Sequence, residues 1–202
     1  MKHSKEDVEN FVEFCGTRLG KEIIKKEAEY IGKKFKGRKF ILDVGCGIAS
    51  LEARLSDLNI VGLDSSPEML KEARKRTDKP LILSSAEKLP FWDSSFDAIL
   101  FLTTLEFLPN FKKAIAEAYR VLKPKGLVLA MVLNPESKYF LDHLKKPTSY
   151  FHRAKHRNME KLTKAFSAFK KIRTEYFLGI NKKVYSSKDP KKAALFCILA
   201  EK

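Results

Sequence analysis

Between residues 39 and 133, short apolar runs alternate with stretches of helical spacing, and this alternation constrains the fold more than any other feature. Strands are predicted at 39–44, 59–63, 80–83, 96–102 and 126–133, with helices at 49–55, 67–76 and 111–122. The runs ILDV, AILFL and LVLAMVL are apolar throughout most of their length, as strands buried on both faces must be. The pattern predicts an α/β fold, in which a mostly parallel sheet has helices on both faces.

The segments on either side of this region are expected to complete a single domain over residues 1–202. Apolar residues at helical spacing predict an N-terminal helical cap over residues 1–35, in one or two pieces. Over residues 134–157 the pattern gives way to proline, aromatic and basic residues, so this segment is the candidate lid or acceptor-binding segment. A helix at 158–169 and two closing strands at 171–178 and 193–200 are predicted after it.

Composition excludes several classes of protein. With 44% hydrophobic and 32% charged residues, the chain can form a packed core and is not generally disordered. No apolar run reaches the roughly 18 residues of a membrane helix, and the opening MKHSKEDVEN lacks the apolar segment of a signal peptide. Cys15, Cys46 and Cys197 form neither a disulfide framework nor a zinc spacing. We therefore expect a cytoplasmic protein without a bound metal.

The charge is large and unevenly distributed. The net charge is +15, and residues 134–202 contain 17 Lys and Arg against 6 Asp and Glu. Such an excess favours a polyanionic partner, an acidic substrate or a membrane surface, although a solvated lysine-rich face has the same pattern. RNA is one such partner, which would bind along the basic segment 138–173 through phosphate contacts and stacking on Tyr150 and Phe151.

A glycine turn follows the first predicted strand, in the sequence ILDVGCGIAS at 41–50. Gly45 and Gly47 allow a tight turn and let a ligand approach the backbone closely. A dinucleotide remains possible, but Ser50 stands where its fingerprint has a third glycine. A carboxylate at Asp43 would repel a diphosphate and attract an amino group. The turn therefore favours a ligand with an amino-acid end.

The second predicted strand ends in the sequence VGLD, and its last residue is Asp64. An acidic residue at the tip of this strand is placed to accept hydrogen bonds from both hydroxyls of a ribose. The alternative is that Asp64 caps the turn or helix that follows.

Together with three later segments, these motifs resemble the class I S-adenosylmethionine-dependent methyltransferases, in the broad group that includes ubiquinone and menaquinone biosynthesis methyltransferases. SSAEKLPF at 84–91 resembles the adenine-side loop, SSFDAIL at 94–100 the start of strand four, and AEAYRVLKPKG at 116–126 the approach to strand five. The resemblance covers residues 39–133. It implies a Rossmann-like fold whose seven-stranded sheet is mostly parallel with a final antiparallel strand, and S-adenosylmethionine as cofactor.

The resemblance also implies a set of cofactor-binding residues at the ends of the first four strands: Asp43, Gly45, Gly47, Asp64, Ser65, Ser85, Ala86, Glu87, Leu102 and Thr103. Asp43 would lie near the methionine amino group, Asp64 at the ribose, and Ala86 with Glu87 beside the adenine. Ser85 stands where the family usually has an aspartate that binds the adenine amino group.

In a methyltransferase of this kind the protein holds the acceptor in line with the methyl–sulfur bond and excludes water. A base is needed only where the acceptor must lose a proton. Glu106, just beyond strand four, is the first candidate, and a carboxylate at a helix start is its alternative role. The candidate lid offers further titratable and aromatic side chains: His143, His152, His156, Tyr139, Tyr150 and Phe151.

Three interpretations of the acceptor are open. A small molecule is the commonest choice for this architecture, and an RNA such as tRNA would account for the basic C-terminal third. The third possibility is a S-adenosylmethionine-binding partner protein without its own chemistry. Salt dependence separates RNA from a small molecule, because phosphate contacts weaken steeply with ionic strength. Turnover of the cofactor separates both from the third.

Overall fold

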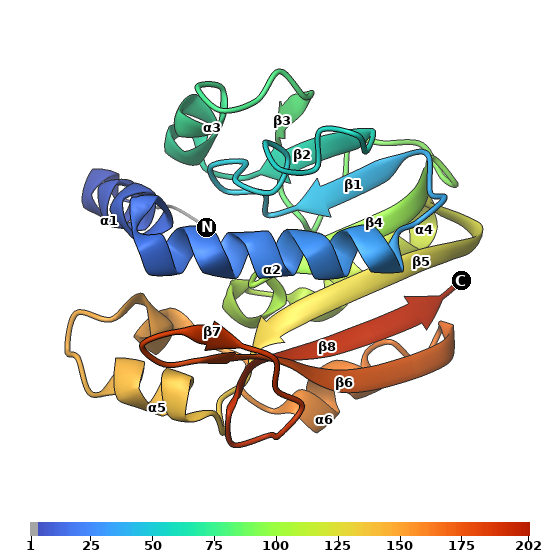
Figure 1. The fold of residues 1–202 in the computed structure, drawn as a ribbon. Helices are drawn as coiled ribbons and strands as arrows, with labels where there is room; N and C mark the ends of the chain where they lie inside the picture. The colour runs from blue at the N-terminus through green and yellow to red at the C-terminus, as the bar shows by residue number, and fades with distance from the viewer. Residues whose placement is uncertain (1–3) are drawn as a thin grey trace.

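The computed structural model describes residues 4–202, so residues 1–3 of the predicted helical cap lie outside the described residues. Figure 1 shows one twisted sheet with helices on both of its faces. Its eight strands lie in the order β3-β2-β1-β4-β5-β8-β6-β7. They are β1 (Ile41–Val44), β2 (Ile60–Asp64), β3 (Leu81–Leu83), β4 (Phe96–Leu102), β5 (Leu122–Leu133), β6 (Lys170–Ile180), β7 (Val184–Tyr185) and β8 (Ala193–Glu201).

Each α-helix follows a residue whose side chain accepts a hydrogen bond from the first turn. Ser4 and Thr17 cap the first two helices, and Ser66 caps the third, with Pro67 in its first turn as the sequence predicts. The helices are α1 (Lys5–Gly16), α2 (Arg18–Lys34), α3 (Pro67–Ala73), α4 (Phe111–Val121), α5 (Lys138–Leu144) and α6 (Met159–Lys164), with short 3-10 helices η1 (Leu105–Phe107) and η2 (Tyr150–Arg153).

The pairing of the strands is that of the predicted fold with one addition. Strands β1 to β5 are joined in parallel, and β8 runs antiparallel between β5 and β6. This confirms a mostly parallel sheet with an antiparallel strand near the C-terminus. The sheet has eight strands rather than seven because β7, two residues long, forms a hairpin with β6.

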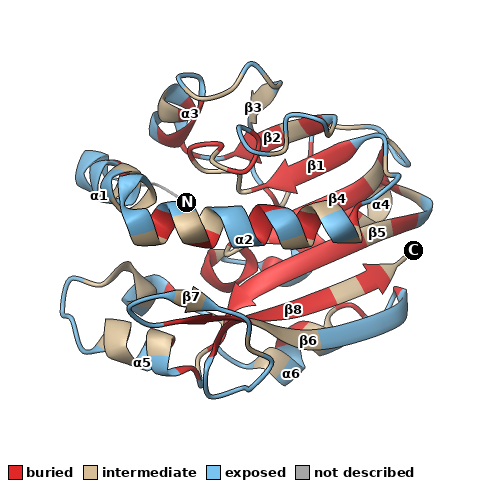
Figure 2. Ribbon diagram, viewed as in Figure 1, coloured by how far each residue is buried: buried red, intermediate tan, exposed pale blue. Residues whose placement is uncertain are grey.

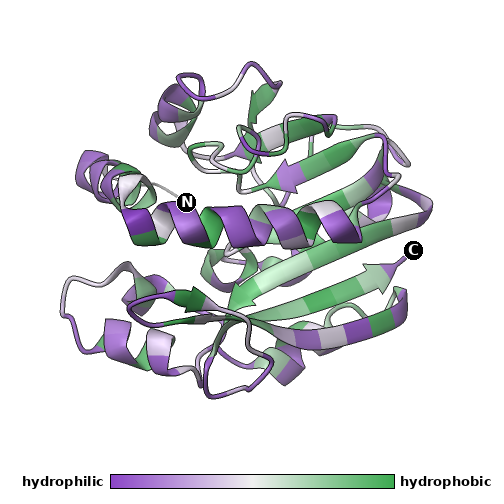
Figure 3. Cartoon of the chain, in the orientation of Figure 1, coloured by the Kyte–Doolittle hydropathy of each residue, from purple (hydrophilic) through white to green (hydrophobic). Residues whose placement is uncertain are grey.

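Alternate residues of the central strands supply two separate cores. Leu129 and Met131 of β5 pack with α2 and α5 on one face, whereas Val128 and Ala130 pack with α4 and α6 on the other. Figure 2 shows that β1, β4 and β5 are buried along most of their length, whereas the N-terminal part of β6 is exposed. In Figure 3 hydrophobic and hydrophilic residues alternate along α2, as expected of a helix that covers a sheet with one side only. The two cores fix the strand ends that carry the site.

Several predicted elements differ from the observed ones, among them the helix predicted at 67–76, which ends at Ala73. Residues 47–54 form successive turns instead of the predicted helix at 49–55. Ala49 has φ 56°, in the left-handed region, and a right-handed helix cannot run through it. The predicted helix at 158–169 ends at Lys164. Strand β5 begins at Leu122, four residues before the prediction, and reaches its regular register through a bulge in which Lys125 has φ 62°.

Candidate cofactor and acceptor site

A cavity of about 650 Å³ lies at the carboxyl ends of β1, β2 and β4, where a parallel sheet of this kind binds its ligands. Its other walls come from α1, α2, α5 and η2. All ten residues predicted to bind the cofactor line this one cavity: Asp43, Gly45, Gly47, Asp64, Ser65, Ser85, Ala86, Glu87, Leu102 and Thr103. The structure therefore brings the predicted residues together, and their binding of the cofactor stays a prediction.

The glycine turn has a geometry that side chains would obstruct. Gly45 has φ 85° and Gly47 has φ 55°. A Cβ atom on Gly45 would collide with the side chain of Thr104. The N–H of Gly45 donates to the carbonyl of Leu63 at 2.7 Å, which ties the turn to the end of β2. A bare backbone at the tip of β1 therefore faces the cavity.

Asp64 holds two neighbouring turns and also faces the cavity. Its Oδ2 atom accepts from the N–H of Gly47 at 2.9 Å, and its Oδ1 atom accepts from the N–H of Ser66 at 2.9 Å. The capping role considered from the sequence is thus present. Each carboxylate oxygen has a second lone pair, so the capping bonds leave acceptor capacity for a ligand.

Asp43 is the polar group at the base of the cavity, where it is only 3% exposed. Its Oδ1 atom is buried without a hydrogen-bond partner, as are both carboxyl oxygens of Glu52, which lies behind it. Burial and the adjacent Glu52 carboxylate raise the pKa of Asp43 well above its usual value, and burial raises the pKa of Glu52 to about 7. Both carboxyls therefore hold a proton more readily than a carboxyl in water does.

The adenine-side loop is held by its own polar groups. The Oγ atom of Ser85 accepts from the N–H of Glu87 at 3.1 Å, and Oε1 of Glu87 accepts from the N–H of Asn110 at 2.9 Å. At the end of β4, Thr103 has φ 45° and donates its N–H to the carbonyl of Met131 at 2.7 Å. These bonds hold the loop and the β4 tip, both of which line the cavity.

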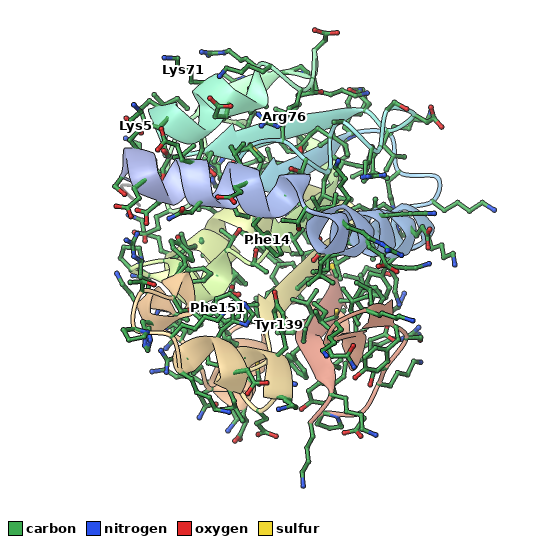
Figure 4. The ribbon with its side chains drawn as sticks, turned by 60° about the vertical axis from the view of Figure 1, so that its left-hand side comes forward. Lys5, Phe14, Lys71, Arg76, Tyr139 and Phe151 are labelled. Atoms are coloured by element: carbon green, nitrogen blue, oxygen red, sulfur yellow. The ribbon has the colours of Figure 1, made fainter. Side chains whose placement is uncertain are left out.

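The end of the cavity away from the glycine turn is aromatic. Phe14 of α1, Tyr139 of α5 and Phe151 of η2 line it, and in Figure 4 these three labelled side chains lie around the space between α1 and α5. The ring of His143 stacks on Phe151 at 4.5 Å with an angle of 18°. Glu27 of α2 lies in the same wall. This end has the composition of a pocket for a small organic molecule.

The remaining candidates divide between the cavity and its surroundings. Tyr139, Tyr150, Phe151 and His143 line the cavity, as predicted for the segment 134–157. His152 and His156 are not among the lining residues, and their Nε2 atoms contact the backbone carbonyls of Lys146 and Leu108.

Glu106 also lies outside the cavity wall. It is 1% exposed, and its Oε1 atom accepts from the N–H of Leu133 at 2.8 Å. Burial raises the pKa of its carboxyl to about 7. Its role as proton acceptor stays a prediction. In the structure its side chain is buried next to Leu133, the last residue of β5.

Sequence reasoning missed Glu27 and Glu52. A signal for Glu27 was present, because it stands four residues from both Ile23 and Ile31 and so on the buried side of α2. For Glu52 the expected helix at 49–55 hid the signal, since the turns that replace this helix bring its side chain behind Asp43.

No cluster of three or more metal-ligating side chains occurs within residues 4–202. None of the helices in that range is both long enough and apolar enough to cross a membrane.

Comparison with known proteins places these features in a family. A methyltransferase domain model matches residues 42–130. An uncharacterized protein of Methanocaldococcus jannaschii is 44% identical over 109 residues, which are 54% of this chain and 42% of that protein. Demethylmenaquinone methyltransferase of Thermotoga maritima is 39% identical over 106 residues, 50% of this chain and 46% of that enzyme. The chain thus spans about half the length of these curated relatives.

Solved structures share the fold over nearly the whole chain. A methyltransferase of Thermotoga maritima, described as a possible histamine N-methyltransferase, has a TM-score of 0.83 at 21% identity and covers 98% of this chain and 97% of its own. A S-adenosylmethionine-dependent methyltransferase of Archaeoglobus fulgidus has a TM-score of 0.76 at 19% identity, covering 96% and 99%. With its ordered motifs, its sheet topology and these likenesses, the chain carries the methyltransferase domain of the class I S-adenosylmethionine-dependent methyltransferases, whose cofactor is S-adenosylmethionine.

Proposed function

We propose that this protein transfers a methyl group from S-adenosylmethionine to a small-molecule acceptor bound in the same cavity. The observation that carries the proposal is the continuity of the cavity: a bare glycine turn and an unpartnered buried carboxyl lie at one end and an aromatic pocket at the other. A site of this shape can hold a cofactor and an acceptor side by side.

The residues present fit the cofactor. The unpartnered Oδ1 atom of Asp43 is placed to accept a hydrogen bond from the amino group of the methionine part, which is cationic. Gly45 and Gly47 line the cavity with backbone that carries no side chain. Asp64 has lone pairs left for the ribose hydroxyls, and the loop at Ser85 would flank the adenine.

S-adenosylmethionine supplies a methyl group that its positive sulfur has already activated. The contribution of the chain is to orient the acceptor and to keep water out, and proximity alone is worth about 7–11 kcal/mol. Leu102 and Thr103 stand between the two ends of the cavity, at the tip of β4. The aromatic side chains Phe14, Tyr139 and Phe151 would hold the body of the acceptor by burying its apolar surface.

The enclosure of the aromatic end supports a small acceptor over a macromolecular one. Helices α1 and α2 form one wall and α5 with η2 the other, and Arg153 of η2 donates to Oδ2 of Asp7 of α1 at 2.8 Å. This ion pair joins the two walls.

Calorimetric titration with S-adenosylmethionine and, separately, NAD tests the cofactor site. We expect micromolar binding of S-adenosylmethionine alone. Asp43→Asn keeps the volume of the side chain but removes its charge. The affinity for S-adenosylmethionine should therefore fall at least tenfold while the protein stays folded. The matched control is Asp57→Asn, because Asp57 is exposed and outside the cavity.

Equal affinity of the two variants for S-adenosylmethionine would show that the site is wrongly assigned. Transfer itself is tested by the appearance of S-adenosylhomocysteine when small-molecule extracts are added. Binding of S-adenosylmethionine without any such turnover would favour a binding protein over an enzyme.

A further inference from the structure

Glu27 is a buried acidic group that the proposed cofactor site does not use. It lies on α2, is 7% exposed and lines the aromatic end of the cavity. Within residues 4–202 it has no hydrogen bond or ion pair, and burial alone raises the pKa of its carboxyl, to about 8. An unpartnered carboxyl in such a place costs stability, because desolvation is not offset by a hydrogen bond. A group of this kind is expected to have its partner in a ligand.

The charges around the cavity indicate what that ligand carries. Although the whole chain has a net charge of +15, the side chains that line the cavity include five carboxyls and a single lysine, Lys146. The carboxyls are those of Asp7, Glu27, Asp43, Asp64 and Glu87. Asp7 is paired with Arg153, and the last three lie at the proposed cofactor end. Glu27 is left as the acidic group of the acceptor end.

The surroundings of Glu27 suit a cation with an apolar body. The aromatic side chains of Phe14, Tyr139 and Phe151 line this end of the cavity (Figure 4). Ile180 and Leu195 add aliphatic surface beyond them. Aromatic rings attract a cation that lies over their faces, and a buried carboxylate binds it through a charge-assisted hydrogen bond.

We propose that the acceptor end of the cavity binds a small amine, whose cationic nitrogen pairs with the Glu27 carboxylate while its aromatic or alkyl body packs against Phe14, Tyr139 and Phe151. The inference rests on the proposed function, since it names the class of acceptor for the same cavity. Glu27 is here a binding and specificity residue. The alcohol and the carboxylate of the same carbon skeleton lack the cation and should bind less well.

The pH dependence of binding follows from the groups that face Glu27. These are Cys15 of α1, Tyr139 of α5 and Cys197 of β8. Burial raises the pKa of Cys15, and burial raises the pKa of Tyr139 and of Cys197 to about 12, so these three stay neutral at neutral pH. A cationic amine must displace the proton of Glu27 below about pH 8. Amine affinity should therefore rise from pH 6 to pH 8, by up to about tenfold per pH unit.

The experiment measures binding of a panel of primary and secondary amines with phenyl, indolyl or alkyl bodies, each paired with the alcohol of the same skeleton. Calorimetry is done on the full chain saturated with S-adenosylhomocysteine. We expect at least one amine to bind more than tenfold tighter than its alcohol, with affinity rising as the pH increases. Glu27→Gln should abolish both the preference and its pH dependence.

The matched control is Glu29→Gln, an exposed position on the same helix, which should behave as the unmodified protein. If no amine binds more tightly than its alcohol, or if Glu27→Gln keeps the preference, the inference is overturned. Affinity for S-adenosylmethionine is measured on the same variants and should not change in Glu27→Gln. Failure of the unmodified protein to bind S-adenosylmethionine would instead overturn the proposed function.

Discussion

Asp43 of β1 lies beside Glu52 because the turns after β1 bring the Glu52 carboxyl against Gly62 of β2, the residue that pairs with Asp43. Burial raises the pKa of Asp43 well above its usual value and the pKa of Glu52 to about 7. The ammonium of a bound ligand favours the ionised form of Asp43, whereas a proton on the pair opposes binding. The cofactor site is thus sensitive to pH through a residue, Glu52, that does not line it.

We predict that affinity for S-adenosylmethionine falls as the pH is lowered through about 7, the pKa of Glu52. The sign follows because protonation removes the negative charge that the ammonium needs. Glu52→Gln removes the repulsion that raises the pKa of Asp43, so the loss of affinity should move to lower pH. Calorimetry between pH 5.5 and 8.5 measures the affinity for S-adenosylmethionine of the unmodified protein and of Glu52→Gln. The same flat pH profile in both proteins would refute this prediction.

Gly45 gives a second prediction at the scale of single residues. Gly45→Ala places a side chain at φ 85° and against Thr104, which is 9% exposed and has little room to move. We expect the free energy of unfolding to fall by about 2 kcal/mol or more, with loss of S-adenosylmethionine binding. Denaturant unfolding and calorimetry measure the two effects.

The control for Gly45→Ala is Gly32→Ala, in the interior of α2. Its new Cβ atom would lie 3.7 Å from Leu55, an ordinary contact. In the interior of a helix, alanine is more favourable than glycine by about 0.5–1 kcal/mol of folding free energy. This variant should therefore be more stable than the unmodified protein. A similar loss of stability in both variants would show that the strained turn has no special role.

At the scale of elements, the segment 134–157 and helix α1 form the two sides of the cavity mouth. Arg153 of η2 contacts Asp7 of α1 and lies over the ring of Tyr150 at 5.1 Å. The Arg153 side chain is 45% exposed, so its ion pair adds little to global stability. Its effect should be local, on how often the two sides separate.

Arg153→Ala is expected to lower the free energy of unfolding by less than about 1 kcal/mol. Amide hydrogens in α1 and η2 should nevertheless exchange faster, because opening of the mouth no longer breaks an ion pair. Lys145→Ala is the control, since it removes a pair with Asp142 that lies within one helix turn. Unchanged exchange in α1 would argue against a bridge between the walls.

The elements show where sequence reasoning succeeds and where it stops. Strand β4 was predicted with its observed bounds, 96–102, because a run buried on both faces is bordered by charged and polar residues. The strand β7 is two residues long and exists through pairing with β6, which a local pattern does not encode. The helix expected at 49–55 failed because Ala49 takes a left-handed conformation that its sequence does not announce.

The same contrast holds for the site. The ten residues predicted to bind the cofactor follow from motifs at strand ends, and parallel strands bring such ends to one edge of a sheet. Glu27 is distant in sequence from Tyr139, and Glu52 approaches Asp43 through irregular turns. Contacts of this kind depend on tertiary packing, so no pattern along the chain predicts them.

At the scale of the whole molecule, positive charge lies outside and negative charge lines the cavity. Lys5 and Lys71 lie on the outer surface, away from Phe14, Tyr139 and Phe151 (Figure 4). Several basic residues of the segment 138–173 are held in ion pairs, with Lys138 and Lys145 both on Asp142. RNA binding through this segment stays a prediction. The dependence of methyl transfer on salt concentration tests it.

We expect methyl transfer to the small-molecule acceptor to change less than about twofold between 50 and 200 mM salt. An RNA acceptor held by six phosphate contacts would lose roughly a thousandfold in affinity over that range. Labelled methyl incorporation into total tRNA and into a small-molecule extract, each at both salt concentrations, separates the two. Incorporation into tRNA that disappears at high salt would favour RNA as the acceptor.

The position of β8 between β5 and β6 also sets the order in which the molecule can be assembled during synthesis. Strand β6 pairs with β8 and not with β5. It can therefore join the sheet only after β8 has been synthesised and has paired with β5. The half of the sheet that carries the glycine turn can form from β1 to β5 alone, whereas Ala194 and Leu195 of the acceptor wall arrive with β8. A ribosome-bound chain therefore passes through a stage in which the acceptor end lacks Ala194 and Leu195 and β5 has an open edge.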